Sequence, residues 1–224
     1  MFLTSILKPY CLLCADYNGN EIGLCDPCFK NLPWHKSAQC PQCALITDSA
    51  ICGNCLNAAP DFDATYALFT YTYPIDSILQ QYKYNDMLHL ADVFAKLFHQ
   101  QHNIGHRIDL VIPMPMHPQR LQERGFNQAL EIARCLAKSL KLELNYQACQ
   151  RIKLTPPQAG LPLKDRIKNV RGVFECKQSL QGLNIAIVDD VMTTGASLNE
   201  LAKTLKKAGA ARVECWVIAR TLPK

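Results

Sequence analysis

Ile185-Ala-Ile-Val-Asp-Asp-Val-Met-Thr-Thr-Gly-Ala-Ser197 is the stretch that decides the fold. Four apolar residues, typical of a buried strand, run directly into the carboxylates Asp189 and Asp190, and a short loop of hydroxyl residues and glycine follows. Residues 198–207 then carry apolar side chains at helical spacing. Because a loop between a strand and a helix presents backbone N–H groups and the positive end of the helix dipole, it predicts an anion site.

The side chains of this loop suit a phosphorylated sugar. Thr193, Thr194 and Ser197 add hydroxyl donors, and Gly195 lets the backbone approach a phosphate closely. The two carboxylates would lie at the vicinal hydroxyls of a ribose whose 5-phosphate occupied the loop. The alternative is a buried strand that ends in a polar turn, but strand, acid pair, loop and helix rarely occur in this order by chance.

The same thirteen residues resemble the signature with which type I phosphoribosyltransferases bind phosphoribosyl pyrophosphate (PRPP). The resemblance implies that the acid pair holds the ribose hydroxyls and that the loop cradles the 5-phosphate. The implied PRPP-binding residues are Asp189, Asp190, Val191, Thr193, Thr194, Gly195, Ala196 and Ser197. PRPP would bind as its Mg²⁺ complex, because Mg²⁺ takes several of its oxygen ligands from substrate phosphates.

The first 60 residues carry eight of the twelve cysteines, in four Cys-x-x-Cys pairs separated by ten, eleven and eight residues. Each such turn aims two thiolates at one metal, and two turns complete a tetrahedral zinc site. The segments between the pairs are too short to form a core, so metal would supply the folding energy. We expect two structural zinc sites, as in a double zinc ribbon, and sequential or interleaved pairing of the turns both remain open. The expected ligands are Cys11, Cys14, Cys25, Cys28, Cys40, Cys43, Cys52 and Cys55.

The rest of the chain predicts an α/β fold, with a type I phosphoribosyltransferase-like parallel sheet covered by helices on both faces. The pattern divides the chain into the ribbon at 1–60 and a phosphoribosyltransferase-like domain at 61–224. Within that domain, 61–105 form a candidate hood over a core at 106–224. Strands are expected at 62–73, 108–114, 185–188 and 213–219, and helices at 76–84, 87–101, 127–140 and 198–207. The 114–125 and 189–197 loops should meet at the carboxyl ends of the strands, where such sheets bind ligands.

The net charge of +5 is unevenly distributed, since residues 117–171 hold eleven Lys and Arg but four Asp and Glu. Such a basic stretch could meet pyrophosphate, a nucleic-acid backbone or both, although each single cation could also be surface charge. The candidate contacts are Arg120, Arg124, Asn127, Gln128, Lys164 and Arg166. Arg151 and Lys153 lead into a proline- and glycine-rich stretch suited to a lid, and could stabilise departing pyrophosphate. Together with the acid pair they are the catalytic candidates.

The ribbon itself is a poor candidate for DNA binding. A zinc ion with four thiolates carries a formal charge of −2, and the first 60 residues offer three lysines to a phosphate backbone. Trp34 could stack on bases, or pack against the second domain.

Three further patterns accompany the PRPP signature: Arg120-x-x-x-Arg-Gly-Phe-Asn-Gln128, Arg151-x-x-x-Thr155-x-x-Gln158-x-x-Leu161 and Arg166-x-x-Asn169-Val-x-Gly172-x-Phe174. With the cysteine-rich front, they make the whole chain resemble the ComF family. The resemblance implies the handling of incoming single-stranded DNA in competent bacteria, together with PRPP and other competence or recombination proteins. Some relatives are associated with DNA as a nutrient, so phosphoribosyl transfer to a nucleobase or nucleotide in salvage is the alternative. The acceptor, and whether transfer occurs, stay open.

No apolar run approaches the roughly 20 residues that a membrane helix needs. Residues 1–10 lack the basic start and small-residue cleavage site of a signal peptide. We therefore expect a cytoplasmic protein without membrane insertion.

Overall fold

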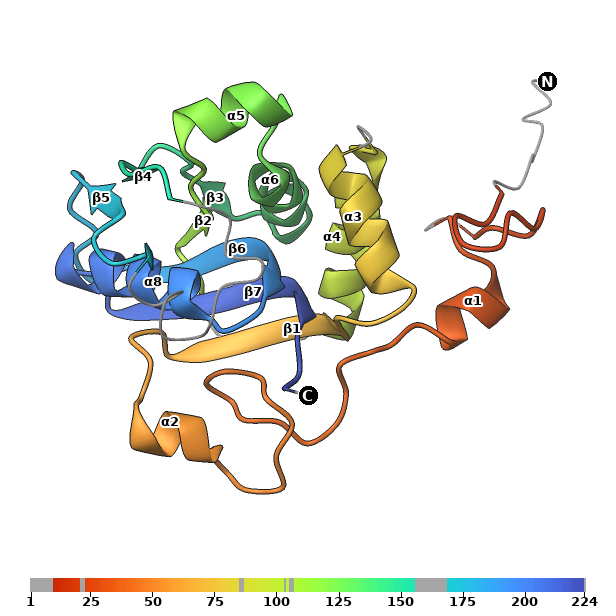
Figure 1. Ribbon diagram of the computed structural model, residues 1–224, viewed down its shortest axis with the longest axis horizontal. Helices are drawn as coiled ribbons and strands as arrows, with labels where there is room; N and C mark the ends of the chain where they lie inside the picture. Colours follow the sequence, from red (N-terminus) through yellow and green to blue (C-terminus); the bar gives the residue numbers. More distant parts are fainter. Residues whose placement is uncertain are drawn as a thin grey trace.

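The computed structural model describes residues 10–20, 23–84, 87–102, 104, 107–155 and 169–223 (Figure 1). Its centre is a five-stranded sheet in the order β1-β7-β6-β2-β3, in which all neighbouring strands run parallel. The strands are β1 (Ala64–Thr70), β2 (Leu110–Pro113), β3 (Glu143–Leu144), β6 (Asn184–Met192) and β7 (Arg212–Arg220). The predicted parallel α/β sheet is confirmed.

Helices cover both faces of the sheet, as the sequence predicts. On one face α4 (His89–Gln101), α6 (Gln128–Leu140) and α3 (Ile75–Tyr84) share a core with Trp216 and Ile218 of β7; Phe98 of α4 contacts Trp216, and α6 lies against β6 and β2. On the other face α8 (Ala196–Lys207) packs against Val213 and Val217 of the same strand. Alternate residues of β7 thus enter opposite cores, which explains why a central parallel strand is apolar along nearly its whole length.

The acid pair lies inside a strand, not after it. Strand β6 was expected to end at Val188, yet its pairing with β7 continues from Asn184↔Arg212 to Met192↔Arg220. The backbone hydrogen bonds between β6 and β7 therefore continue past Asp189 and Asp190. The two carboxylates therefore lie near the carboxyl edge of the sheet, on a part of β6 whose backbone is still paired with β7.

The candidate hood at 61–105 contributes β1 to the main sheet, where it pairs in parallel with β7. The parts of this segment outside the sheet include α3 and α4. Several elements were not expected from the sequence, among them α5 (Pro118–Arg124) within the 114–125 loop, the edge strand β3, and an antiparallel pair of β4 (Cys149–Arg151) with β5 (Phe174–Cys176). Strand β4 comes shortly before the stretch proposed as a lid, 155–162, of which 156–162 lie outside the described part of the chain.

The N-terminal region covers the open edge of β1. The N–H of Thr70 donates to the carbonyl of Pro33 at 2.8 Å, and the N–H of His35 donates to Leu68 at 3.1 Å. Further along, the N–H of Thr65 donates to Pro41 at 3.1 Å. Because an unpaired edge strand is a template for aggregation, this cover completes the sheet.

The two cysteine-rich halves flank that edge on opposite faces (Figure 1). The half with α1 (Asp26–Lys30) packs with α3 and α4, whereas the half with α2 (Gly53–Asn57) packs on the face that α8 covers. Among the described helices, none is long and apolar enough to cross a membrane.

Candidate functional site

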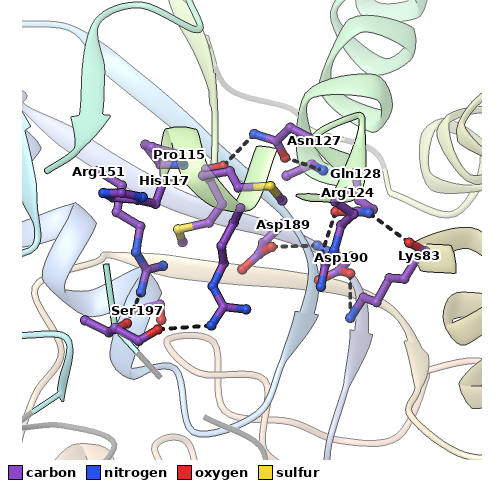
Figure 2. Close-up of a pocket in the computed structure, with 15 residues that line it drawn as sticks. Lys83, Pro115, His117, Arg124, Asn127, Gln128, Arg151, Asp189, Asp190 and Ser197 are labelled. Atoms are coloured by element: carbon purple, nitrogen blue, oxygen red, sulfur yellow. Dashed lines mark hydrogen bonds and ion pairs between the residues drawn. The ribbon is translucent and has the colours of Figure 1, made fainter. Parts of the chain in front are cut away.

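A cavity of ≈ 220 Å³ opens at the carboxyl edge of the sheet, where β2 and β6 end (Figure 2). Its walls come from α3, the 114–117 loop, α5, the start of α6, β4 and β6. The lining residues are Lys83, Met114, Pro115, Met116, His117, Arg120, Arg124, Asn127, Gln128, Ala129, Arg151, Thr155, Asp189, Asp190 and Ser197. The sequence-predicted acid pair and arginines therefore share one cavity.

Asp189 and Asp190 form the acidic side of the cavity. Asp189 Oδ1 accepts from the N–H of Asp190 at 2.9 Å, and Asp190 Oδ1 accepts from the N–H of Val191 at 2.7 Å. Burial, followed by the charge of Asp190, raises the pKa of the Asp189 carboxyl from 3.8 to about 8. Burial and the charge of Asp190 therefore favour the protonated form of the Asp189 carboxyl, whereas cations such as Lys83 favour the carboxylate.

Lys83 is a site residue that the sequence analysis missed. Its Nζ lies 2.7 Å from Asp190 Oδ2, and its position at the end of α3 brings it across the cavity from Arg151 (Figure 2). Burial opposes the charge of Lys83, but Asp190 and then Asp189 outweigh burial and raise the pKa of this amine. The lysine is therefore a fixed positive charge at the acid pair.

The loop after β6 has the geometry of an anion-binding turn. Gly195 adopts a left-handed backbone with φ 79°, and a Cβ added there would lie 2.7 Å from Met192 Cε. Its carbonyl accepts from the N–H of Asn199 at 2.8 Å, which starts the first turn of α8. Ser197 reaches the cavity wall from this turn, so the N-terminus of the helix faces the same space as the acid pair.

Three arginines from two elements form the basic side. Arg120 of α5 donates to the carbonyl of Thr155 at 3.1 Å, and Arg151 at the end of β4 donates to Thr155 Oγ1 at 2.7 Å. Arg124 donates to Gln128 Oε1 at 3.0 Å. Burial, followed by the charge of Arg120, lowers the pKa of Arg151. A ligand with several negative oxygens would relieve this repulsion.

Asn127 and Gln128 position the walls of the cavity. Asn127 caps α6 by accepting from the N–H of Ala129 at 3.0 Å, and it donates to the carbonyl of Met114 at 3.1 Å. Gln128 is buried, and its carbonyl accepts from the hydroxyl of Tyr82 at 3.1 Å. Both residues therefore tie α6 to neighbouring elements.

The eight paired cysteines form two quartets, Cys11/Cys14/Cys25/Cys28 and Cys40/Cys43/Cys52/Cys55. In each quartet all four Sγ atoms lie within 4.8 Å of one another. The Sγ atoms of Cys14 and Cys25 are 3.6 Å apart, and those of Cys43 and Cys52 are 3.5 Å apart. Zn–S bonds of about 2.3 Å place tetrahedral sulfurs about 3.8 Å apart, so both quartets fit structural zinc. The pairing is sequential.

Backbone N–H donors lower the pKa of one cysteine in each quartet, whereas the pKa values of Cys25, Cys28, Cys43 and Cys55 are raised. Burial raises the pKa of Cys11 and Cys40, but backbone N–H donors from the surrounding turns outweigh it, giving about 6 for Cys11 and about 7 for Cys40. In each quartet the residue directly after the first Cys-x-x-Cys pair has a left-handed backbone: Ala15 with φ 59° and Ala44 with φ 56°. The two quartets thus repeat one local design.

Family comparisons agree with this architecture. A family model for a double zinc ribbon domain matches residues 2–58, and one for a phosphoribosyl transferase domain matches residues 128–222. Competence protein F of Haemophilus influenzae is 31% identical over 222 residues, which cover 92% of this chain and 96% of that protein. The chain belongs to the ComF family.

Other ComF relatives carry two different names. The DNA utilization protein YhgH of Salmonella typhi is 32% identical over 208 residues, covering 89% of this chain and 91% of the relative. Competence protein ComFC of Streptococcus pneumoniae is 27% identical over 201 residues, covering 88% and 87%.

Several predicted residues of this ComF chain lie apart from the cavity wall. Lys153 is exposed and approaches Gly172, where an added Cβ would lie 3.5 Å from its Nζ. Thr193, Thr194, Gly195 and Ala196 form the turn below Ser197, and Val191 packs against the core on the α6 face. Lys164 and Arg166 lie outside the described residues.

Trp34 packs within the protein. Its ring lies 5.1 Å from Phe29 and 4.9 Å from Phe69 of β1, between ring centroids, and its Nε1 donates to the carbonyl of Phe29 at 3.2 Å. Of the two alternatives for this side chain, packing against the second domain is the one observed.

Proposed function

We propose that this ComF protein binds PRPP with Mg²⁺ at the carboxyl edge of its sheet and acts in the cytoplasm in natural competence, handling incoming single-stranded DNA during transformation. The observation that carries the proposal is the shared cavity, in which an acid pair, a helix N-terminus and three arginines face one another. Each group matches one part of PRPP: ribose hydroxyls, 5-phosphate and pyrophosphate.

The residues divide the work by charge. Asp189 and Asp190 would accept hydrogen bonds from the ribose hydroxyls, and the 193–197 turn with Ser197 would hold the 5-phosphate. Arg120, Arg124 and Arg151 would bind pyrophosphate and stabilise its charge if it departs. Mg²⁺, when bound with PRPP, would neutralise phosphate charge, and the acid pair supplies the oxygen ligands that this ion prefers.

The DNA part of the proposal is supported by relatives and by charge. Relatives are named for competence or for DNA utilization, and residues 117–171 carry the main excess of positive charge. Binding to a phosphate backbone through such a segment should weaken steeply with salt. Other competence or recombination proteins are the expected partners.

The test separates PRPP binding from DNA binding. Zinc-loaded wild type, Asp190→Asn and the exposed control Asp92→Asn are titrated with PRPP and Mg²⁺ by calorimetry, and with labelled oligothymidine by fluorescence anisotropy. Loss of a hydrogen bond from a charged group, about 1.5–3 kcal/mol, should weaken PRPP binding roughly 10- to 100-fold in Asp190→Asn. Oligothymidine affinity should stay unchanged in both variants.

Two results would reject parts of the proposal. A folded, zinc-loaded wild type that binds no PRPP would leave a DNA-binding scaffold as the account. A wild type that releases pyrophosphate when a nucleobase or nucleotide is added would favour the alternative, an active phosphoribosyltransferase in salvage or in the use of DNA as a nutrient.

A further inference from the structure

Arg220, at the end of β7, joins two parts of the molecule that the proposed function leaves separate. Its side chain is buried, with the residue 3% exposed. The guanidinium donates to the carbonyl of Cys43 at 2.8 Å through Nε. Through Nη1 it donates to the carbonyls of Met192 at 3.0 Å, Thr221 at 2.9 Å and Thr193.

One end of this bridge is the phosphate-binding turn. Met192 pairs with Arg220 across the β6–β7 ladder and is the last residue of β6, and Thr193 is the first residue of the turn. Because the carbonyls of both residues are held by one planar guanidinium, the path of the backbone into the 193–197 turn is fixed. Removing the guanidinium would take this donor from the buried Cys43 carbonyl and from Thr193, whereas the Met192 carbonyl would keep the N–H of Thr221 at 3.0 Å.

The other end is the second zinc quartet. Cys43 is one of its ligands, and the quartet with zinc carries a formal charge of −2, so the guanidinium is a neighbouring counter-charge. His35 adds a second attachment, because its Nε2 lies 2.7 Å from the carbonyl of Ala44 and its Nδ1 lies 3.1 Å from Thr70 Oγ1. The Cys40–Ala44 turn is therefore connected to the sheet at two points, to β7 through Arg220 and to β1 through His35.

The first quartet is embedded differently. Cys11 and Cys25 pack in the core on the α3 and α4 face, whereas the second quartet shares a core with Phe62, which lies 3.9 Å from the Cβ position of Gly195. The described contacts thus lead from the second quartet, and not from the first, to the phosphate-binding turn.

We propose that Arg220 is a positioning residue through which zinc in the Cys40/Cys43/Cys52/Cys55 site orders the phosphate-binding turn. Phosphate or PRPP affinity then depends on the second zinc and is independent of the first. The claim about PRPP affinity rests on the proposed function, whereas the claim that the second zinc orders the turn does not.

The test measures hydrogen exchange of the 193–197 amides without ligand. Arg220→Met is compared with Arg220→Lys, which keeps the charge and part of the hydrogen bonding, and with Arg134→Met, which removes a half-exposed arginine of α6. Exchange in the turn should be roughly tenfold or more faster in Arg220→Met, intermediate in Arg220→Lys and unchanged in Arg134→Met. Amides of 185–188 serve as the global reference, which a general loss of stability would also accelerate.

The zinc arm uses Cys55→Ser and Cys28→Ser, with zinc content measured for each. Cys55→Ser should accelerate exchange in the turn, and Cys28→Ser should leave it as in wild type. Equal exchange in the turn for all variants, or acceleration shared with 185–188, would overturn the proposal. Failure of wild type to bind PRPP would reject the proposed function alone, because the exchange readout needs no ligand.

Discussion

The two zinc quartets share their chemistry and differ in what surrounds them. Both use four cysteines on two turns, and both place a left-handed alanine after the first turn. Yet all four cysteines of the second quartet are buried, whereas Cys14 of the first is exposed. The second quartet borders the 193–197 turn, and the first borders α3 and α4. Ligand spacing therefore predicts the metal, but only packing shows which zinc can affect the site.

The largest expected difference between the quartets is in stability. Cys40→Ser, at a fully buried ligand, should cost several kcal/mol of folding free energy, while Cys14→Ser should cost clearly less. Each variant should retain one of two zinc ions. Thermal denaturation with zinc analysis checks this, and equal losses of stability in the two variants would remove the distinction.

The acid pair predicts a pH-dependent difference in stability between wild type and Asp189→Asn. The pKa of Asp189 is raised to about 8 in the folded state, so between about pH 4 and pH 8 the folded protein binds a proton that the unfolded chain lacks. Stability contributed by this group falls as pH rises through that window. Asp189→Asn should remove this pH-dependent destabilisation, so its stabilising effect should grow by about 2–3 kcal/mol from pH 6 to pH 9.

Urea denaturation at both pH values measures this effect. The exposed Asp92→Asn should show a flat difference from wild type. An Asp189→Asn protein that gains nothing at pH 9 would mean that the carboxyl ionises without cost.

Substituting Lys83 tests whether this lysine at the end of α3 lowers the pKa of Asp189 and so supports PRPP binding. Lys83→Met removes the cation 2.7 Å from Asp190 and should push the pKa of Asp189 higher still. PRPP binding should then weaken by roughly tenfold at pH 7 and recover as pH rises, whereas Lys83→Arg should stay near wild type. Calorimetric titration across pH checks the profile, and a uniform loss at every pH would assign Lys83 to direct ligand contact instead.

The attachment of each quartet to its surroundings gives a further comparison. His35→Ala leaves the buried carbonyl of Ala44 without its imidazole partner and should cost about 1–3 kcal/mol. Asn20→Ala, which removes an acceptor for the N–H of Leu24 near the first quartet, should cost less. Chemical denaturation of the two variants gives the comparison, and a larger loss in Asn20→Ala would reverse it.

Local chemistry explains what could be predicted from the sequence. Each Cys-x-x-Cys turn and the stretch from the acid pair to the glycine turn are local in the chain, so their spacing predicted two cysteine quartets and a strand–turn–helix unit but left the pairing of the turns open. Lys83 and Arg220 carried no such signal, because Lys83 meets Asp190 and Arg220 meets Cys43 only after folding, the latter across 177 positions. Helix α5 did have a signal that went unused: His117 and Pro118 at its start and the left-handed Gly125 at its end.

The strand assignments show the same limit. The sequence indicated a strand near 62–73, but its place beside β7 depends on long-range pairing. The acid pair was expected after β6, since carboxylates usually end a buried strand, and the β7 ladder extended the strand through them. Tertiary pairing therefore decided both outcomes.

The most direct test of the account is a hydrogen-exchange footprint of PRPP on the zinc-loaded wild type. With PRPP and Mg²⁺, slower exchange is predicted at the 193–197 amides and unchanged exchange at 26–30 of α1, in the half of the ribbon that holds the first quartet. Protection elsewhere, with no change in the turn under saturating PRPP, would contradict a PRPP site built from the acid pair and this loop.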